Sequence, residues 1–409
     1  MDDGSSDFSK SNEAAVYTGP RDYRTQGRHG VTPELSHDDC ERFNILAHVN
    51  RYAGSLLPTV RAAYEVRVEP RFVQERGRAP ANRHEARKAL LGEPIYQFYS
   101  ALWRGTMEQR QQAGRFIALS QAEALAEKVG ELTNGDDRLE LDPSLKLPRY
   151  ISEIDHHCMP GSYHSELFPG DVTTAASYDI GFFVTLGGGG SPWLNSCGAG
   201  LVAWLKQFRP DFKPRRILEV GTTMGHNALP LAEAYPDAEV VCVDLGAPVL
   251  RYGLARAKTL GVENVRFVQA DATDLNKFED ESFDLIFSAM FLHEISFAAM
   301  RKIFKENYRL VKEGGLVIHL EQPGYNDEVP IIDQAMRDWH AFYNNEPFMS
   351  TLKDVDVYKY YEDAGFPTSG LFYGMPDCFV SGCELEGGKG RPPKSWANKL
   401  GLQAIGAEK

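Results

Sequence analysis

The sequence predicts an α/β protein with a mostly parallel sheet, preceded by a helical N-terminal domain. Three observations lead to this prediction. After Pro214, short apolar stretches alternate with amphipathic segments, which is the pattern of βαβ units. Before that point, apolar residues recur at helical spacing from about residue 40 to residue 130. The length of 409 residues allows two or three domains.

The N-terminal third divides into a tail and a helical part. Residues 1–35 are polar, with few aliphatic side chains, and are expected to form a flexible tail. Ser36 and Asp39 have the spacing of a capping box and open a helical domain expected over 36–135. Pro58 is expected to begin a further helix, because proline suits a first helical turn.

Two segments lack a clear period. Residues 136–212 begin with turn formers and include four consecutive glycines, so we expect a linker followed by a shaped loop or lid. Residues 384–409 are polar and rich in Gly and Pro, and are expected to be a loosely held tail.

The charge balance excludes some partners. Asp and Glu number 57 against 44 Lys and Arg, and a net charge of −13 disfavours nucleic acid and anionic membranes. Residues 41–130, however, hold 14 basic and 9 acidic side chains. This excess is either a solvated helix surface or a mildly cationic wall that faces an anionic acceptor or a partner subunit. With no signal-like or membrane-spanning apolar run, and with scattered cysteines, the protein is expected to be cytoplasmic.

A nucleotide-binding pattern opens the α/β part. The strand expected at 216–220 is followed by a turn containing Gly221 and Gly225, where backbone N–H groups can approach a ligand at a helix start. The next strand ends at Asp244, 23 residues after Gly221, where a carboxylate can accept both hydroxyls of a ribose. Further strands are expected at 265–269, 283–288 and 316–320, and near Gly370.

These motifs resemble those of the class I S-adenosylmethionine-dependent methyltransferases. The acidic-x-Gly-x-Gly-x-Gly motif of that family corresponds to Glu219, Gly221, Thr223 and Gly225, with threonine in place of the middle glycine. The third-strand motif, the fourth strand and the turn before the fifth strand also correspond. The resemblance covers 213–322 well and 323–380 loosely. It implies a doubly wound, Rossmann-like sheet of seven strands within 213–383, with an acceptor-side insertion and the last strands at 323–380.

The resemblance also implies S-adenosyl-L-methionine as the methyl donor. Asp271 would contact the adenine amino group, and Tyr178 would cover the donor from the lid segment. A dehydrogenase is the competing interpretation of a Gly-rich turn with an acid, but it does not account for Asp271. The expected donor-binding residues are Tyr178, Glu219, Gly221, Thr222, Gly225, Asp244, Leu245, Asp271, Ala272 and Ser288.

The acceptor is expected at the carboxyl ends of the strands, where open α/β sheets bind ligands. His293 follows the fourth strand and is the candidate catalytic base, because its unperturbed pKa lies near neutrality; packing within the donor pocket is the alternative. No metal site is predicted, although metal assistance would draw on other histidines (His156, His157, His164 or His319). The expected substrate-binding residues are Tyr163, His293, Trp339 and Phe348.

The predicted function is methyl transfer to a small molecule, most simply to a hydroxyl or carboxylate oxygen, since His293 serves the former and the latter needs no base. A C- or N-methyltransferase, a protein methyltransferase and a non-catalytic donor-binding protein are the alternatives. The acceptor is expected to be a small molecule, with an anionic one favoured by the basic helical segment. A homodimer formed through the N-terminal helices is also expected.

Overall fold

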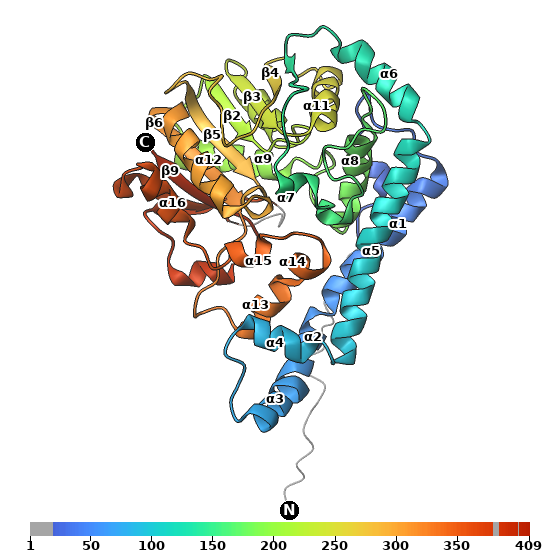
Figure 1. Cartoon of the computed structure of the whole chain (residues 1–409), viewed down its shortest axis with the longest axis vertical. Coiled ribbons are helices and arrows are strands. Elements are labelled where there is room, and N and C mark those ends of the chain that lie inside the picture. The colour runs from blue at the N-terminus through green and yellow to red at the C-terminus, as the bar shows by residue number, and fades with distance from the viewer. Residues whose placement is uncertain (1–18, 379–383, 400) are drawn as a thin grey trace, which may run out of the picture.

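The computed structural model describes residues 19–378, 384–399 and 401–409 (Figure 1). These residues form one sheet of nine strands, in the order β1-β4-β3-β2-β5-β6-β9-β7-β8. The first five strands along the chain are β1 (Leu139–Glu140), β2 (Arg216–Val220), β3 (Glu239–Asp244), β4 (Val265–Gln269) and β5 (Phe283–Ala289). The others are β6 (Val311–Glu321), β7 (Leu371–Met375), β8 (Glu386–Lys389) and β9 (Gln403–Glu408).

The seven inner strands confirm the predicted sheet. Strands β4, β3, β2, β5 and β6 run parallel; β9 is antiparallel to β6, and β7, which pairs antiparallel with β9, runs in the same direction as β6. The short strands β1 and β8 extend it at its two edges. Because the strand order reverses beside β2, the carboxyl ends of β2 and β5 leave a crevice where a ligand can lie.

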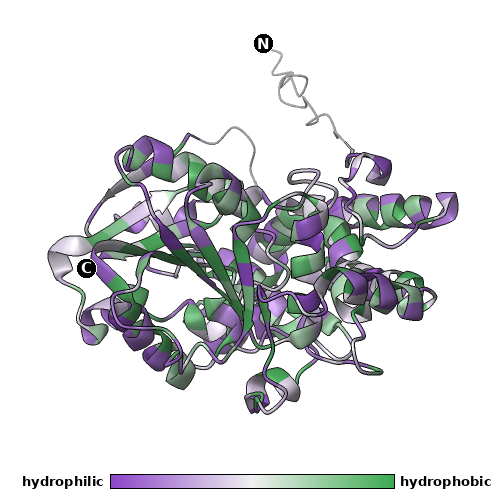
Figure 2. Cartoon of the chain, turned by 90° about the horizontal axis from the view of Figure 1, so that it is seen from above, coloured by the Kyte–Doolittle hydropathy of each residue, from purple (hydrophilic) through white to green (hydrophobic). Residues whose placement is uncertain are grey.

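Both faces of the sheet are buried, as the continuous apolar strands predict. Successive side chains of a strand point to opposite faces, so Ile217 and Leu218 belong to two different hydrophobic clusters. One face is covered by α9 (Ser196–Phe208), α10 (Ala228–Ala234) and α11 (Ala247–Thr259), and the other by α12 (Phe297–Leu310) and α16 (Val357–Ala364). Figure 2 shows hydrophobic residues concentrated in the strands between these layers.

The N-terminal region is helical, and its longest helix is α5 (Pro94–Leu119), with 26 residues (Figure 1). Ser36 and Asp39 form the predicted capping box at α1, and Pro58 lies in the first turn of α2. A π-helical turn at Tyr64–Val68 joins α2 to α3. The remaining helices of this region are α1 (His37–Ser55), α2 (Leu57–Ala63), α3 (Glu69–Arg76), α4 (Arg83–Leu90) and α6 (Ala122–Thr133).

The insertion after β6 packs against these N-terminal helices. It forms α13 (Ile331–Arg337), α14 (Trp339–Tyr343) and α15 (Met349–Leu352), which lie beside α4 and α5 in Figure 1. The buried guanidinium of Arg83 on α4 forms ion pairs with Asp338 and Asp354, each at 2.6 Å. The helical region and the insertion therefore form a continuous wall at the carboxyl ends of the strands.

The prediction of a flexible tail over 1–35 is wrong for its second half. Residues 1–18 lie outside the described residues, but 19–35 pack against the body of the protein. Tyr23 is buried and its hydroxyl donates to the carbonyl of Ile180, while His29 pairs with Asp179 at 2.9 Å. The sequence did not predict that this segment is ordered, because the segment contains few aliphatic residues. Aromatic and imidazole side chains attach it to the protein, and they form no periodic apolar face.

The prediction of a loosely held tail over 384–409 is also wrong. Strand β9 lies inside the sheet between β6 and β7, and its Ala404 and Ala407 are fully buried. The close approach of Phe372 needs a glycine at 406, where a Cβ would lie 2.3 Å from the ring. Small residues suit so crowded a strand, but they give a weak hydrophobic signal in the sequence. Residues 379–383, also assigned to the domain ahead of this tail, lie outside the described residues.

The segment expected as linker and lid, 136–212, is more regular than predicted. Strand β1 joins the sheet edge, and the aperiodic stretch contains α7 (Arg149–Ser152) and the buried helix α8 (Thr173–Thr185). Helix α8 is apolar on nearly every side because it is enclosed by α1, α5 and α11, so it shows no amphipathic period. No described helix has the length and hydropathy needed to cross a membrane.

Candidate functional site

The turn after β2 has the backbone shape of a nucleotide-binding loop. Gly221, Thr223 and Gly225 all have positive φ, at 72°, 50° and 76°. At Gly221 glycine is needed for space as well, since a Cβ would lie 2.4 Å from the ring of Phe291. Thr223 keeps the left-handed conformation that a glycine would adopt more readily, and its N–H donates to the Asp244 carboxylate at 2.8 Å. The substitution at the middle glycine therefore leaves the loop geometry intact.

Two acids stand at the carboxyl ends of the neighbouring strands. Asp244 ends β3 and also accepts the N–H of Gly246 at 2.9 Å. Burial raises the pKa of Asp244 to about 6, because the charged form loses hydration. Asp271 follows β4 and accepts the N–H of Thr273 at 2.8 Å. Both side chains are thus fixed by backbone donors and keep acceptor capacity for a ligand.

A cavity of about 290 Å³ lies at these strand ends. Its walls come from the glycine loop, the ends of β3, β4 and β5, helices α5 and α8, and the insertion after β6. This wall brings together most of the residues that the sequence predicts. Those that line the cavity are Tyr163, Tyr178, Gly221, Asp244, Leu245, Asp271, Ala272 and His293.

Four predicted donor residues lie behind the cavity rather than in its wall. Glu219 is buried and accepts the hydroxyl of Thr222, and burial raises the pKa of Glu219 to about 8. This pair supports the glycine loop from below. Gly225 packs under Phe267, where a Cβ would lie 3.1 Å from the ring, and Ser288 hydrogen-bonds His319 at 2.7 Å. We therefore assign these four to the support of the loop and strand ends.

Two predicted substrate-binding residues, Trp339 and Phe348, do not line the cavity. Trp339 is fully buried, stacks on Trp103 with ring centroids 4.9 Å apart, and donates its indole N–H to Ser100. Phe348 packs edge-on against Tyr150. Both hold the insertion in place outside the cavity wall, and their contact with the acceptor stays a prediction.

His293 is held by a carboxylate from the next strand. It lies in a 3-10 turn after β5, and its Nδ1 is 2.8 Å from an oxygen of Glu321, the last residue of β6. Its Nε2 is 3.7 Å from Glu346 Oε2, which is too long for a hydrogen bond. Burial opposes the charged form, but the carboxylates of Glu321, Glu346 and Glu294 together outweigh burial and raise the pKa of His293. The second ring nitrogen is therefore the one available to a ligand.

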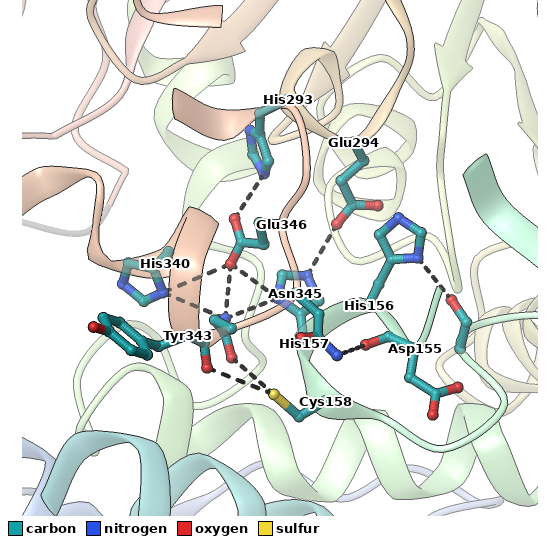
Figure 3. A network of polar contacts seen from close by, with 12 residues as sticks. Asp155, His156, His157, Cys158, His293, Glu294, His340, Tyr343, Asn345 and Glu346 are labelled. Carbon is teal, nitrogen blue, oxygen red and sulfur yellow. Dashed lines mark hydrogen bonds and ion pairs between the residues drawn. The ribbon is translucent and has the colours of Figure 1, made fainter. Parts of the chain in front are cut away.

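A second histidine is fixed in the same wall. His157 Nε2 is 2.9 Å from Glu294, and its Nδ1 is 3.2 Å from Glu346 (Figure 3). Burial opposes its charge, but Glu346 and Glu294 raise the pKa of His157 to about 10. Glu294 also accepts the hydroxyl of Tyr163 at 3.1 Å. His157, Glu294, His293, Glu321, Glu346 and the nearby His340 form what we call the histidine–glutamate cluster.

Glu346 occupies the centre of this cluster in Figure 3. Its Oε1 accepts the amide of Asn344 at 2.7 Å and lies 3.6 Å from His340, whereas its buried Oε2 has no hydrogen-bond partner. Burial favours the neutral acid, but His157 and the other histidines lower the pKa of Glu346 below its usual range. An ionised oxygen without a partner is suited to accept a hydrogen bond from a ligand.

Sequence reasoning missed the roles of Glu321, Glu346 and His340. The position of Glu321 carried a usable signal, because it ends the strand next to the one that His293 follows. The two others enter from a long insertion with no motif. Of the histidines weighed as metal ligands, His157 belongs to this cluster and His164 lines the cavity, whereas His156 contacts Ser162 and His319 contacts Ser288. Among the described residues, no group of three or more His, Cys, Asp or Glu side chains is arranged to hold a metal ion.

Comparisons with known proteins agree with this geometry. Residues 217–315 match the family model of a methyltransferase domain. The chain is 40% identical over 110 residues to a demethylmenaquinone methyltransferase of Thermus thermophilus, covering 27% of this chain and 48% of that protein. A second demethylmenaquinone methyltransferase, from Roseiflexus castenholzii, is 36% identical over 164 residues, covering 40% and 63%. The chain thus spans about half the length of the curated relatives it matches.

Among solved structures, an O-methyltransferase family protein from Burkholderia thailandensis is 14% identical, with a TM-score of 0.43, covering 74% of this chain and 71% of that one. A phosphoethanolamine N-methyltransferase from Haemonchus contortus is 25% identical, with a TM-score of 0.32, covering 41% and 36%. The family match coincides with the strands that carry the glycine loop, Asp244 and Asp271. The chain therefore carries a class I S-adenosylmethionine-dependent methyltransferase domain.

Proposed function

We propose that this protein transfers the methyl group of S-adenosyl-L-methionine to an oxygen of a small-molecule acceptor. One observation carries the proposal: a single cavity joins the glycine loop and the two strand-end acids to a buried histidine held by a carboxylate. The donor-binding part and a group able to remove a proton thus face one enclosed space. That arrangement suits a displacement in which alignment and exclusion of water supply most of the rate.

The residues of the cavity fit the donor. Asp244 offers a carboxylate that would accept the ribose hydroxyls, and Asp271, which lines the same cavity, would contact the adenine amino group. Gly221 leaves room that a side chain would fill, and Tyr178 lines the cavity from α8. When bound, the donor supplies an electrophilic methyl group attached to a positively charged sulfur.

His293 is the proposed proton acceptor. Glu321 orients the ring through Nδ1, so that Nε2 faces the space beside Glu346 Oε2. An acceptor hydroxyl within hydrogen-bond reach of Nε2 would give its proton to that nitrogen as its oxygen takes the methyl group, and Glu321 would stabilise the resulting imidazolium. An acceptor carboxylate would need no such step. Since only the neutral ring accepts a proton, turnover of a hydroxyl acceptor should rise with pH through the raised pKa of His293.

Methylation at carbon is the second candidate. It is favoured by the resemblance of residues in the donor-binding domain to demethylmenaquinone methyltransferases. Removal of a proton from a ring hydroxyl by His293 would also activate the neighbouring ring carbon. The same base therefore serves both reactions, and the product distinguishes them.

The test has two stages. Calorimetry with S-adenosylhomocysteine should show micromolar or tighter binding, and absence of binding would overturn the proposal. The protein is then incubated with donor carrying a 13C-methyl group and a metabolite extract freed of macromolecules. The chemical shift of the transferred carbon separates methoxy from C-methyl and N-methyl products. A labelled methoxy product supports the proposal, a labelled ring methyl supports the second candidate, and a product on nitrogen contradicts both.

A further inference from the structure

The cavity contains one arginine, Arg110, whose charge is not balanced by any acid among the residues that the structure describes. Arg110 lies near the middle of α5, is only 2% exposed and lines the cavity wall. Its Nε donates to the carbonyl of Gly181 on α8 at 2.9 Å. A Cβ at position 181 would lie 3.0 Å from that same nitrogen, so the two helices hold the guanidinium closely. The group is positioned by packing rather than by an acid.

No described carboxylate pairs with Arg110, and its Nη2 is buried without a hydrogen-bond partner. Burial lowers the pKa of Arg110, and the groups that act against this are Tyr178, Tyr163 and Cys158. None of these three carries a charge at neutral pH, whereas an arginine side chain stays protonated in proteins. The ring of Tyr178, 5.5 Å from the guanidinium carbon, offers only a partial cation–π compensation. A buried cation without a counter-charge is strongly unfavourable, so we expect an anionic ligand to supply the missing charge.

A second polar atom of the wall is also unpaired. Thr185 lies one helical turn after Gly181 on α8 and lines the same cavity. Its Oγ1 is buried and has no hydrogen-bond partner. A guanidinium N–H and a hydroxyl, both unsatisfied and both from adjoining helices, are the donors that an anionic oxygen group requires. Among the described residues that line the cavity, Arg110 is the only lysine or arginine.

We propose that Arg110 is the anion-binding residue of this cavity, receiving a carboxylate or comparable oxyanion of a bound ligand. The proposal rests on the proposed function, and it gives the basic excess of the helical segment one specific role. Two groups share this chemistry: the carboxylate of the donor's amino-acid part and an anionic group on the acceptor. The planar fork of arginine can hold either through two parallel hydrogen bonds, which a lysine cannot.

The experiment compares the wild type with Arg110→Gln and Arg110→Lys, and uses Arg115→Gln, five residues along the same helix and outside this cavity, as the matched control. The donor arm measures S-adenosylhomocysteine against its decarboxylated analogue by calorimetry. If Arg110 holds the donor carboxylate, the wild type prefers S-adenosylhomocysteine by about tenfold or more and Arg110→Gln loses that preference.

The acceptor arm titrates benzoate and phenyl phosphate into protein saturated with S-adenosylhomocysteine. If Arg110 holds the acceptor, these anions bind the wild type at least about tenfold more tightly than Arg110→Gln.

Either result supports the proposal and identifies the source of the anion. Equal binding of all probes to wild type and Arg110→Gln overturns it, while S-adenosylhomocysteine binding shows that the proposed function still stands. If Arg110→Gln does not fold, Arg110→Lys takes its place, because lysine keeps the charge but lacks the planar guanidinium. Unchanged binding of every probe to Arg110→Lys would then overturn the proposal. Melting temperature separates a structural role: the unliganded Arg110→Gln should be no less stable than Arg115→Gln, because it loses an unbalanced buried charge.

Discussion

The donor side and the acceptor side of the cavity are held in different ways. On the donor side, backbone N–H groups fix Asp244, and the glycine loop lies between one strand and one helix. On the acceptor side, side chains from four separate segments fix one another, with His157, His293, Glu321 and Glu346 meeting only in the folded chain. The first arrangement is local and leaves a motif in the sequence. The second is a property of tertiary packing and leaves almost none.

The largest expected effect concerns the acceptor side. His293→Gln should lower kcat by about 10²–10⁴-fold, the usual contribution of a general base, while the affinity for S-adenosylhomocysteine changes less than about threefold. Single-turnover rates with an acceptor found by the labelling experiment, together with calorimetry, measure both quantities. His319→Gln is the control, since that histidine is equally buried but bonds Ser288 behind the cavity. An equal loss of rate and donor affinity would show that His293 only packs.

The next effect concerns the donor side. Asp244→Ala should weaken S-adenosylhomocysteine binding by about 100-fold, because charge-assisted hydrogen bonds to the ribose hydroxyls are lost. Calorimetry at neutral pH measures the change. Asp274→Ala, an exposed acid three residues after Asp271, should bind as the wild type does. Unchanged affinity in Asp244→Ala would contradict the assignment of Asp244 to the ribose. It would also remove the main support for the view that a local sequence motif specifies the donor side.

These two predictions differ in how far the sequence could lead to them. The glycine loop and both acids lie between Val220 and Asp271, and the parallel strands β2 to β6 lie between Arg216 and Glu321. This contiguous stretch of sequence therefore predicts the fold and, through its family resemblance, the donor side. His293 could be proposed because it follows a strand end, but its partner Glu321 is 28 residues away and Glu346 a further 25. Strand β9 was missed for a related reason: its small residues fit a crowded place in the sheet, and only the neighbours reveal that place.

A smaller effect tests whether the cluster tunes its histidine. Glu321 raises the pKa of His293, so Glu321→Gln should lower that pKa. The neutral ring would then be present at lower pH, and the rising limb of kcat against pH should move to lower pH, although the maximal rate falls with the weaker base. The pH profile of Glu321→Asp should stay close to that of the wild type. If the pH profile of Glu321→Gln equals that of the wild type, a group other than His293 determines the rise of kcat with pH.

The smallest effect is a pH dependence confined to the donor side. The pKa of Asp244 is raised to about 6 by burial, and the ionised carboxylate is the form that accepts the ribose hydroxyls. The affinity for S-adenosylhomocysteine should therefore be complete well above pH 6 and fall as the pH drops through that value, by about fourfold at pH 5.5. Calorimetry from pH 5.5 to pH 8 measures it, with Asp244→Asn expected to bind weakly and with a flat profile. If Asp244→Asn keeps the wild-type slope, the titrating group belongs to the histidine–glutamate cluster, and the two sides of the cavity are coupled rather than independent.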